Sequence, residues 1–153
     1  MPALLIVSNC PSANTQKLQD AVVRGAGSED FDNINLTVRQ PLDCTPEDVL
    51  STNGIILGTT ENFGYMSGVV KDFLERIYYP CLEETQGLPA ILFVKGGLDG
   101  QGAKTSMERI ITGLRWNLVQ PTLVMKGDFN SEFITQCEEI GTYMAAGLDA
   151  GIF

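Results

Sequence analysis

Hydroxyl, thiol and amide side chains crowd the segment between the first apolar run of the chain and the first helical pattern. The run over residues 3–7 is continuous and apolar, which is typical of a strand buried on both faces, and residues 14–26 have helical spacing. A helix N-terminus that follows a strand has free N–H groups and a partial positive charge, which can bind phosphate. One N-cap residue, Ser12 or Asn14, would be enough for a capped helix, and the segment exceeds that need. It therefore favours a phosphate cradle over a capped helix alone, with these side chains: Ser8, Cys10, Ser12, Asn14 and Thr15.

Two more segments could complete a binding site. Residues 59–67 include two aromatics separated by Gly64, so a ring could lie against a flat ligand while the glycine lets the backbone approach. Packing on neighbouring loops, or contact with a second copy, would equally explain the aromatics. Residues 95–102 contain four glycines, which favours close backbone approach. Together the three segments suit a flat, phosphorylated ligand. The candidates in the last two segments are Thr59, Thr60, Glu61, Asn62, Phe63, Gly64, Tyr65, Gly96 and Gly97.

Strand and helix patterns alternate along the 153 residues, with no internal repeat or linker. Strands are expected over 3–7, 34–38, 54–58, 89–94 and 121–125, and helices over 14–26, 46–50, 67–79, 103–118 and 131–148. This alternation predicts one α/β domain over 1–153, with a five-stranded parallel sheet between two helical layers. The strand-to-helix turns would then meet at one edge of the sheet, where ligands bind.

Composition excludes several function classes. The chain has no histidine, which removes Ser-His-Asp and Cys-His catalysis and histidine-ligated metals, and we predict no metal site and no catalytic side chain. The net charge of −9 argues against binding to nucleic acid or anionic lipid, and it suits either a basic partner or simple solubility. No apolar run approaches the ~20 residues of a membrane helix, and no signal peptide is evident. We therefore expect a cytoplasmic protein with free thiols at its four cysteines.

Three segments resemble the flavodoxin-like FMN-binding family, and the likeness extends over nearly the whole chain. "SNCPSANTQKL" is similar to the phosphate loop of that family. "GTTENFGYMSGVVKDFLERI" is similar to the G-x-P-x-y-f-G-x-M-s-g-x-x-K-x-F-l-D-R segment of flavodoxin-like quinone reductases and FMN reductases. "KGGLDGQG" resembles the glycine-rich third loop, although a lysine stands where a histidine is common. Thr60 and Glu75 also depart from the family pattern, in which proline and aspartate are usual.

The resemblance implies a flavodoxin-like sheet with strand order 2-1-3-4-5 and noncovalently bound FMN. Ser8, Ser12, Asn14 and Thr15 would hold the phosphate, and Cys10 would line that loop. The segment from Thr59 to Met66 would run beside the ribityl chain and isoalloxazine, and Gly96 and Gly97 would offer backbone to the pyrimidine end. The flavin would supply the redox chemistry, and the negative charge of the chain predicts a low potential.

Two functions remain open at this point. One is an electron carrier that serves a redox partner protein. The other is an NAD(P)H-dependent FMN or quinone reductase, commonly built as a homodimer or tetramer. A low-molecular-weight phosphatase is a distant alternative, because its C-x5-R motif would need arginine where Gln16 stands. A phosphoacceptor receiver domain is set aside, since Ser8, Asn9 and Thr59 occupy the places of its acidic residues.

Overall fold

The central strands are the continuous apolar runs of the sequence. In the computed structural model, which describes residues 1–28, 30–31 and 33–153, these are β1 (Ala3–Ser8), β3 (Gly54–Asn62) and β5 (Pro89–Gly96). β2 (Asn35–Arg39) flanks β1, and β6 (Asn117–Leu118) and β7 (Leu123–Lys126) both pair with β5, giving the order β2-β1-β3-β5-β6. All these pairs are parallel. The expected fold class is confirmed, and the five longest strands lie in the expected order.

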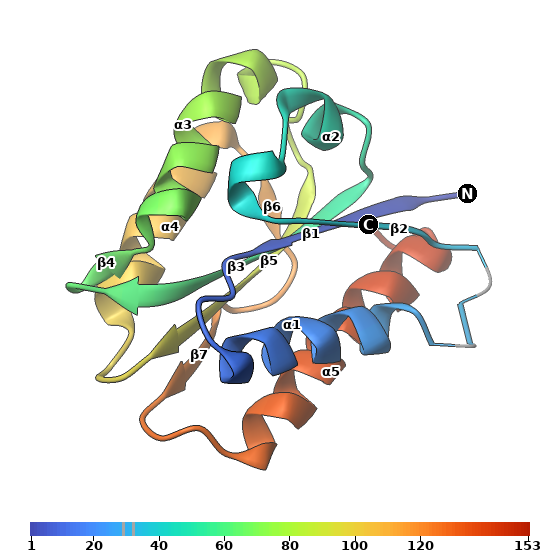
Figure 1. Ribbon diagram of the computed structural model, residues 1–153. Coiled ribbons are helices and arrows are strands. Elements are labelled where there is room, and N and C mark those ends of the chain that lie inside the picture. The colour runs from blue at the N-terminus through green and yellow to red at the C-terminus, as the bar shows by residue number, and fades with distance from the viewer. Residues whose placement is uncertain (29, 32) are drawn as a thin grey trace.

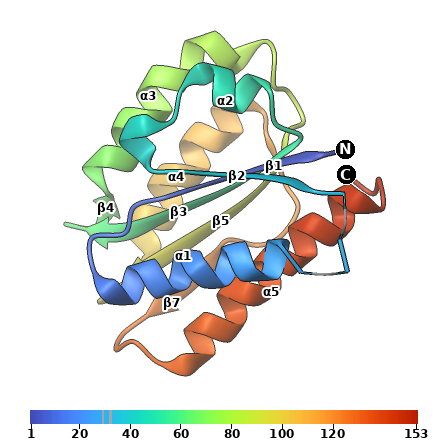
Figure 2. The same ribbon diagram turned by 45° about the vertical axis from the view of Figure 1, so that its right-hand side comes forward.

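Helices cover both faces of the sheet (Figure 1). One face carries α1 (Ala13–Ala26) and α5 (Ser131–Asp149) (Figure 2). The other face carries α2 (Pro46–Leu50), α3 (Gly68–Leu82) and α4 (Gln101–Leu114). A short 3-10 turn at Pro41–Asp43 precedes α2. Each face has its own buried core, one built on Leu5, Val7 and Leu57 and the other on Leu4, Ile6 and Ile56. This division follows from the alternation of side chains along a strand.

The helix expected over 103–118 is shorter than predicted. It ends at Leu114 because Arg115 adopts a left-handed conformation with φ 61°. Trp116 is then buried, and its Nε1 donates to Thr85 Oγ1 at 2.9 Å. Leu118 matched the helical spacing, but it belongs to β6, so the last strand of the sheet comes in two pieces, β6 and β7.

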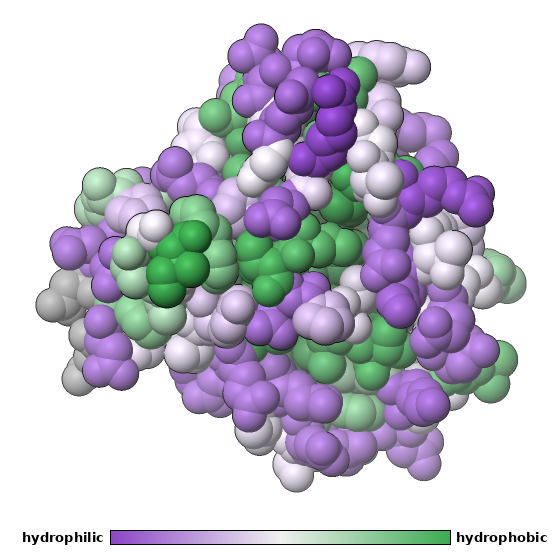
Figure 3. Space-filling model, turned by 180° about the vertical axis from the view of Figure 1, so that it is seen from behind, coloured by the Kyte–Doolittle hydropathy of each residue, from purple (hydrophilic) through white to green (hydrophobic). Residues whose placement is uncertain are grey.

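Seen from behind, apolar side chains gather near the middle of the face, surrounded by polar ones (Figure 3).

A second difference concerns the end of β3. The strand continues to Asn62, four residues beyond the predicted end, and pairs with the short antiparallel strand β4 (Tyr65–Met66). The segment 59–67, expected as a loop, is therefore mostly a β-hairpin that projects from the carboxyl edge of the sheet (Figure 1).

Among the described residues, no helix combines the length and apolar character needed to span a bilayer.

Candidate functional site

A cavity of about 360 Å³ opens at the carboxyl edge of the sheet. The start of α1, the end of β3, the end of β5 and the β7–α5 loop surround it. This is the edge at which ligands bind in parallel α/β sheets. Four of the predicted residues line it, together with four that sequence reasoning did not propose: Ser12, Asn14, Thr15 and Thr60, then Lys95, Gly127, Asp128 and Phe129.

The start of α1 is held by a reciprocal capping box. Thr15 N donates to Ser12 Oγ at 3.2 Å, and Ser12 N donates to Thr15 Oγ1 at 3.0 Å. Within the described part of the chain, the N–H groups of Ala13 and Asn14 have no acceptor, and the Asn14 side chain is exposed. The N-terminal cap of α1 is therefore present, and it leaves two backbone N–H groups without an acceptor at the positive end of the helix.

Ser8 and Cys10 are not among the residues that line the cavity. Ser8 is buried, and its hydroxyl donates to Gln19 Oε1 at 2.7 Å. Cys10 Sγ lies 3.3 Å from the same oxygen. Burial raises the pKa of the Cys10 thiol, the hydrogen bond with Ser8 lowers it by less, and the charge of Asp20 raises it by a still smaller amount. A thiol with a raised pKa is a poor nucleophile, so the phosphatase alternative gains nothing from the structure.

Asn9 was missed, and it joins the first loop to β3. Its Nδ2 donates to Thr60 Oγ1 at 3.0 Å, and its Oδ1 accepts from Thr60 N at 3.1 Å. Thr60 Oγ1 in turn donates to Asn62 Oδ1 at 3.2 Å. This two-point bond sets the position of Thr60 in the cavity wall. The available signal was the adjacency of β1 and β3, which places the residue that follows β1 beside the last residues of β3.

Lys95 was also missed as a candidate. Its Nζ donates to Gly127 O at 2.7 Å and to Gly96 O at 3.3 Å, and it lies 5.8 Å from the centroid of the Phe133 ring. The signal was present in the period of two along β5. Ile91 and Phe93 face the core under α1 and α5, and Lys95 continues that row.

The hairpin turn carries an exposed aromatic in a strained conformation. Phe63 and Gly64 form the two-residue turn with φ 53° and 69°, as a type I′ hairpin requires. A positive φ is unusual for a bulky residue. Phe63 is fully exposed and Tyr65 is 43% exposed, so the Phe63 ring packs against nothing within the described chain. Packing on a neighbouring loop is therefore wrong as the explanation for Phe63, and contact with a ligand or with another chain stays open.

Thr59 and Glu61 accept hydrogen bonds that join β3 to the starts of α3 and α4. Thr59 is buried, and its Oγ1 accepts from Ser67 N at 2.9 Å, at the start of α3. The Glu61 carboxylate accepts from Gly100 N at 3.2 Å and from Ala103 N at 3.4 Å. The N-cap residue of α4, Gly100, has no side chain, so Glu61 supplies the acceptors from another element.

The hairpin over 59–67 and the glycine-rich loop over 95–102 are consequently held together. A Cβ at Gly102 would collide with the carbonyl oxygen of Gly64, so the hairpin rests on the first turn of α4. Gly96 is buried beside Gly100 and Glu61, whereas Gly97 is open to solvent. The remaining hairpin candidates, Asn62 to Tyr65, lie at the same sheet edge as the cavity without lining it.

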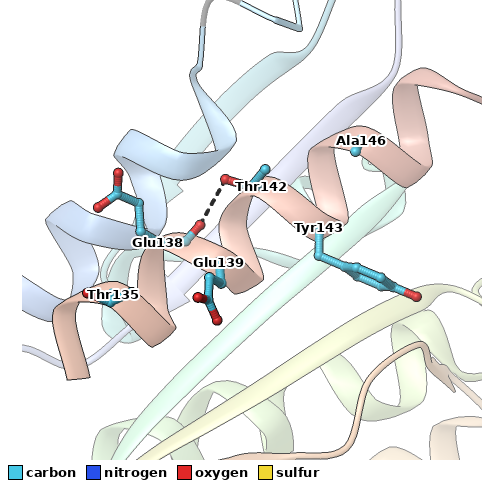
Figure 4. Close-up of a pocket in the computed structure, with 6 residues that line it drawn as sticks. All are labelled: Thr135, Glu138, Glu139, Thr142, Tyr143 and Ala146. Atoms are coloured by element: carbon cyan, nitrogen blue, oxygen red, sulfur yellow. Dashed lines mark hydrogen bonds between the residues drawn. The ribbon is translucent and has the colours of Figure 1, made fainter. Parts of the chain in front are cut away.

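A second hollow, of about 570 Å³, lies on the outer face of α5 (Figure 4). All six residues that line it come from that helix, including Glu138, Glu139 and Tyr143. Thr142 Oγ1 donates to the Glu138 carbonyl at 3.0 Å, which is ordinary helix back-bonding. None of the three loops at the sheet edge reaches this hollow, so it is not the predicted site.

Comparison with known proteins supports the fold. No family model matches the chain. A curated relative, "Flavodoxin" from Aquifex aeolicus (strain VF5), is 28% identical over 114 residues, which cover 74% of this chain and 60% of the relative. A flavodoxin structure from the domain Archaea superimposes with TM-score 0.80 at 16% identity, covering 94% of this chain and 96% of that one.

Two further solved structures are similar. Oxidised Flavodoxin 2 from Bacillus cereus gives TM-score 0.75 at 22% identity, covering 99% of both chains. An NADH:FMN oxidoreductase in its apo form gives TM-score 0.75 at 14% identity, covering 96% of this chain and 90% of that one. The chain therefore has a flavodoxin-like fold, and over 114 residues it is similar in sequence to the Aquifex flavodoxin.

Proposed function

We propose that the chain binds FMN noncovalently at the carboxyl edge of its sheet and acts as an electron-transfer protein or FMN-dependent oxidoreductase. The observation that carries this proposal is the cavity beside the free N-terminal donors of α1. The exposed Phe63 ring lies at the same sheet edge. Helix N-termini bind phosphate groups, and aromatic rings stack on flat ligands. The names of the similar proteins, flavodoxins and an NADH:FMN oxidoreductase, point to the same cofactor.

The residues present fit the two ends of this cofactor. Ser12, Asn14 and Thr15 would hold the phosphate with the α1 N–H groups, and Thr60 would bound it from β3. Phe63 and Tyr65 would lie against the isoalloxazine, with backbone at Gly96 and Gly97 near its pyrimidine edge. Bound FMN would supply the one- and two-electron redox chemistry. Ser8 and Cys10 would support the loop through Gln19 rather than touch the phosphate.

The choice between carrier and reductase depends on the G-x-M-S-G segment and on the net charge. The G-x-M-S-G segment favoured a reductase, but Met66 is 2% exposed and its N–H donates to Ser106 Oγ at 3.3 Å. That methionine therefore serves the packing of the hairpin on α4. The net charge of −9 suits a carrier that docks on a basic redox partner. Turnover of NADH or NADPH without any partner protein would favour the reductase, and a dimer or tetramer in solution would accompany it.

Titration of the purified protein with FMN tests the proposal. We expect the flavin fluorescence to be quenched at stoichiometric ratio and the visible spectrum to shift. A folded protein that leaves FMN fluorescence unchanged would refute cofactor binding. A redox titration of the complex would then examine the expected low potential, which a value near that of free FMN would contradict. The cytoplasmic location stays a prediction from the sequence.

A further inference from the structure

Lys95 occupies an unusual position for a lysine. It lies at the end of the buried strand β5, opposite Thr60 on β3 and Met125 on β7. Its side chain is half-buried, and it lines the cavity that faces the start of α1. Of the residues that line this cavity, it is the only one with a positive charge.

Among the residues that the structure describes, the ammonium group of Lys95 has no carboxylate partner. The ion pairs found within residues 1–28, 30–31 and 33–153 do not include it. It donates instead to two neutral carbonyl oxygens, Gly127 O and Gly96 O. An ammonium has three donors, so one remains for a further acceptor. A partly buried charge without a counter-ion is costly, and an anion in the cavity would compensate it.

The start of α1, which lines the same cavity, is also electropositive. The first turn of α1 offers the free N–H groups of Ala13 and Asn14 and the positive end of the helix dipole. Asp128 is the acidic residue of the lining, and its side chain is exposed, so solvent screens it. Lys17, on the same helix, lies 5.9 Å from the Phe129 ring and is not part of the lining.

We propose that Lys95 is the cationic contact of a phosphomonoester dianion and makes the site selective for FMN over riboflavin. This inference rests on the proposed function. The two carbonyl bonds hold the ammonium in place, so little ordering is needed when the phosphate binds. A phosphate at this point would join α1, β5 and the β7–α5 loop. The lysine would provide the charge that the hydroxyl-rich loop lacks.

Affinities for FMN and for riboflavin, measured in parallel by fluorescence titration, test the inference. Lys95→Met removes the charge and keeps most of the stem, and Lys17→Met removes a nearby charge outside the cavity. Loss of a charged hydrogen bond weakens binding by roughly tenfold to a hundredfold. We expect a loss of that size for FMN with Lys95→Met and no change for riboflavin. Lys17→Met should alter either affinity less than about threefold, because exposed charges at this distance are screened.

The outcomes separate the two proposals. Unchanged FMN affinity in Lys95→Met, or an equal loss for FMN and riboflavin, would overturn the role of Lys95 and leave FMN binding intact. Wild-type protein that binds neither flavin would overturn both. If Lys95→Met does not fold, as judged by circular dichroism, Lys95→Arg and the salt dependence of the wild type replace it. FMN affinity should then fall with salt while riboflavin affinity does not, and equal salt dependence would refute the inference.

Discussion

The β1–α1 loop and the β3–β4 hairpin meet at one edge of the sheet and are held in different ways. The loop is held locally, by the Ser12–Thr15 capping box and by contacts with Gln19. The hairpin depends on a distant element, because Glu61 caps α4 and the turn rests on Gly102. The loop is therefore pre-formed, and it keeps free N–H groups at the start of α1. The hairpin holds an aromatic ring in the open at a cost in backbone strain.

Removing the Glu61 carboxylate should have the largest effect. Glu61→Ala deprives two N–H groups of α4 of their acceptors and separates the hairpin from the third loop. We expect a loss of about 2 kcal/mol in the free energy of unfolding. Urea denaturation at pH 7 measures it, and Glu61→Gln, which keeps the shape and one acceptor, should lose less. Equal stability of wild type and Glu61→Ala would show that the hairpin does not need α4.

Removing the capping box of the first loop should cause a smaller loss in the free energy of unfolding. Ser12→Ala removes the acceptor of Thr15 N and should cost about 1 kcal/mol. FMN affinity should fall together with stability if the loop binds the phosphate. Ser131→Ala is a matched control, because Ser131 is exposed at the start of α5 and Asn130 provides the cap there. A Ser12→Ala protein as stable as this control would contradict the pre-formed loop.

Relieving the strained turn should separate stability from binding. Phe63→Asn places a residue that tolerates positive φ in the type I′ turn, and we expect a gain of about 0.5–1 kcal/mol. If the ring stacks on the isoalloxazine, flavin affinity should fall in the same variant. Thermal unfolding and FMN titration measure the two effects. Unchanged affinity would assign Phe63 to contact with another chain.

The smallest effect concerns the thiol of the first loop. Burial raises the pKa of Cys10, so its thiol stays protonated at neutral pH. Its contribution to stability is present below the ordinary thiol pKa and is lost as the pH rises through the raised value. Alkylation by iodoacetamide should be slower than that of free cysteine at pH 7.5 and should accelerate in alkali. Burial raises the pKa of Cys44 and Cys137 to about 12, so these thiols should react later still. Faster reaction than free cysteine would revive a nucleophilic Cys10.

Sequence reasoning reached the parts of the fold that depend on local patterns. The apolar runs at β1, β3 and β5 predicted the central strands, and Ser12, one of two N-cap candidates, is the N-cap of α1. It failed at Arg115, where a left-handed residue interrupts a stripe that still matched helical spacing at Leu118. It also read the hairpin as a loop, because a phenylalanine in a type I′ turn contradicts the usual preference for asparagine or glycine.

The sequence by itself determined the alternation of strands and helices, the absence of histidine chemistry and the polar loop at the start of α1. The alternation and the polar loop depend on residue types within a few positions of one another, and the absence of histidine is a property of the whole composition. Only the tertiary structure decided that Asn9 holds Thr60, that Glu61 caps α4 and that Lys95 lines one cavity with the start of α1. These arrangements bring together residues about 40 to 80 positions apart. They exist because parallel strands bring their carboxyl ends to one edge, whatever their separation along the chain.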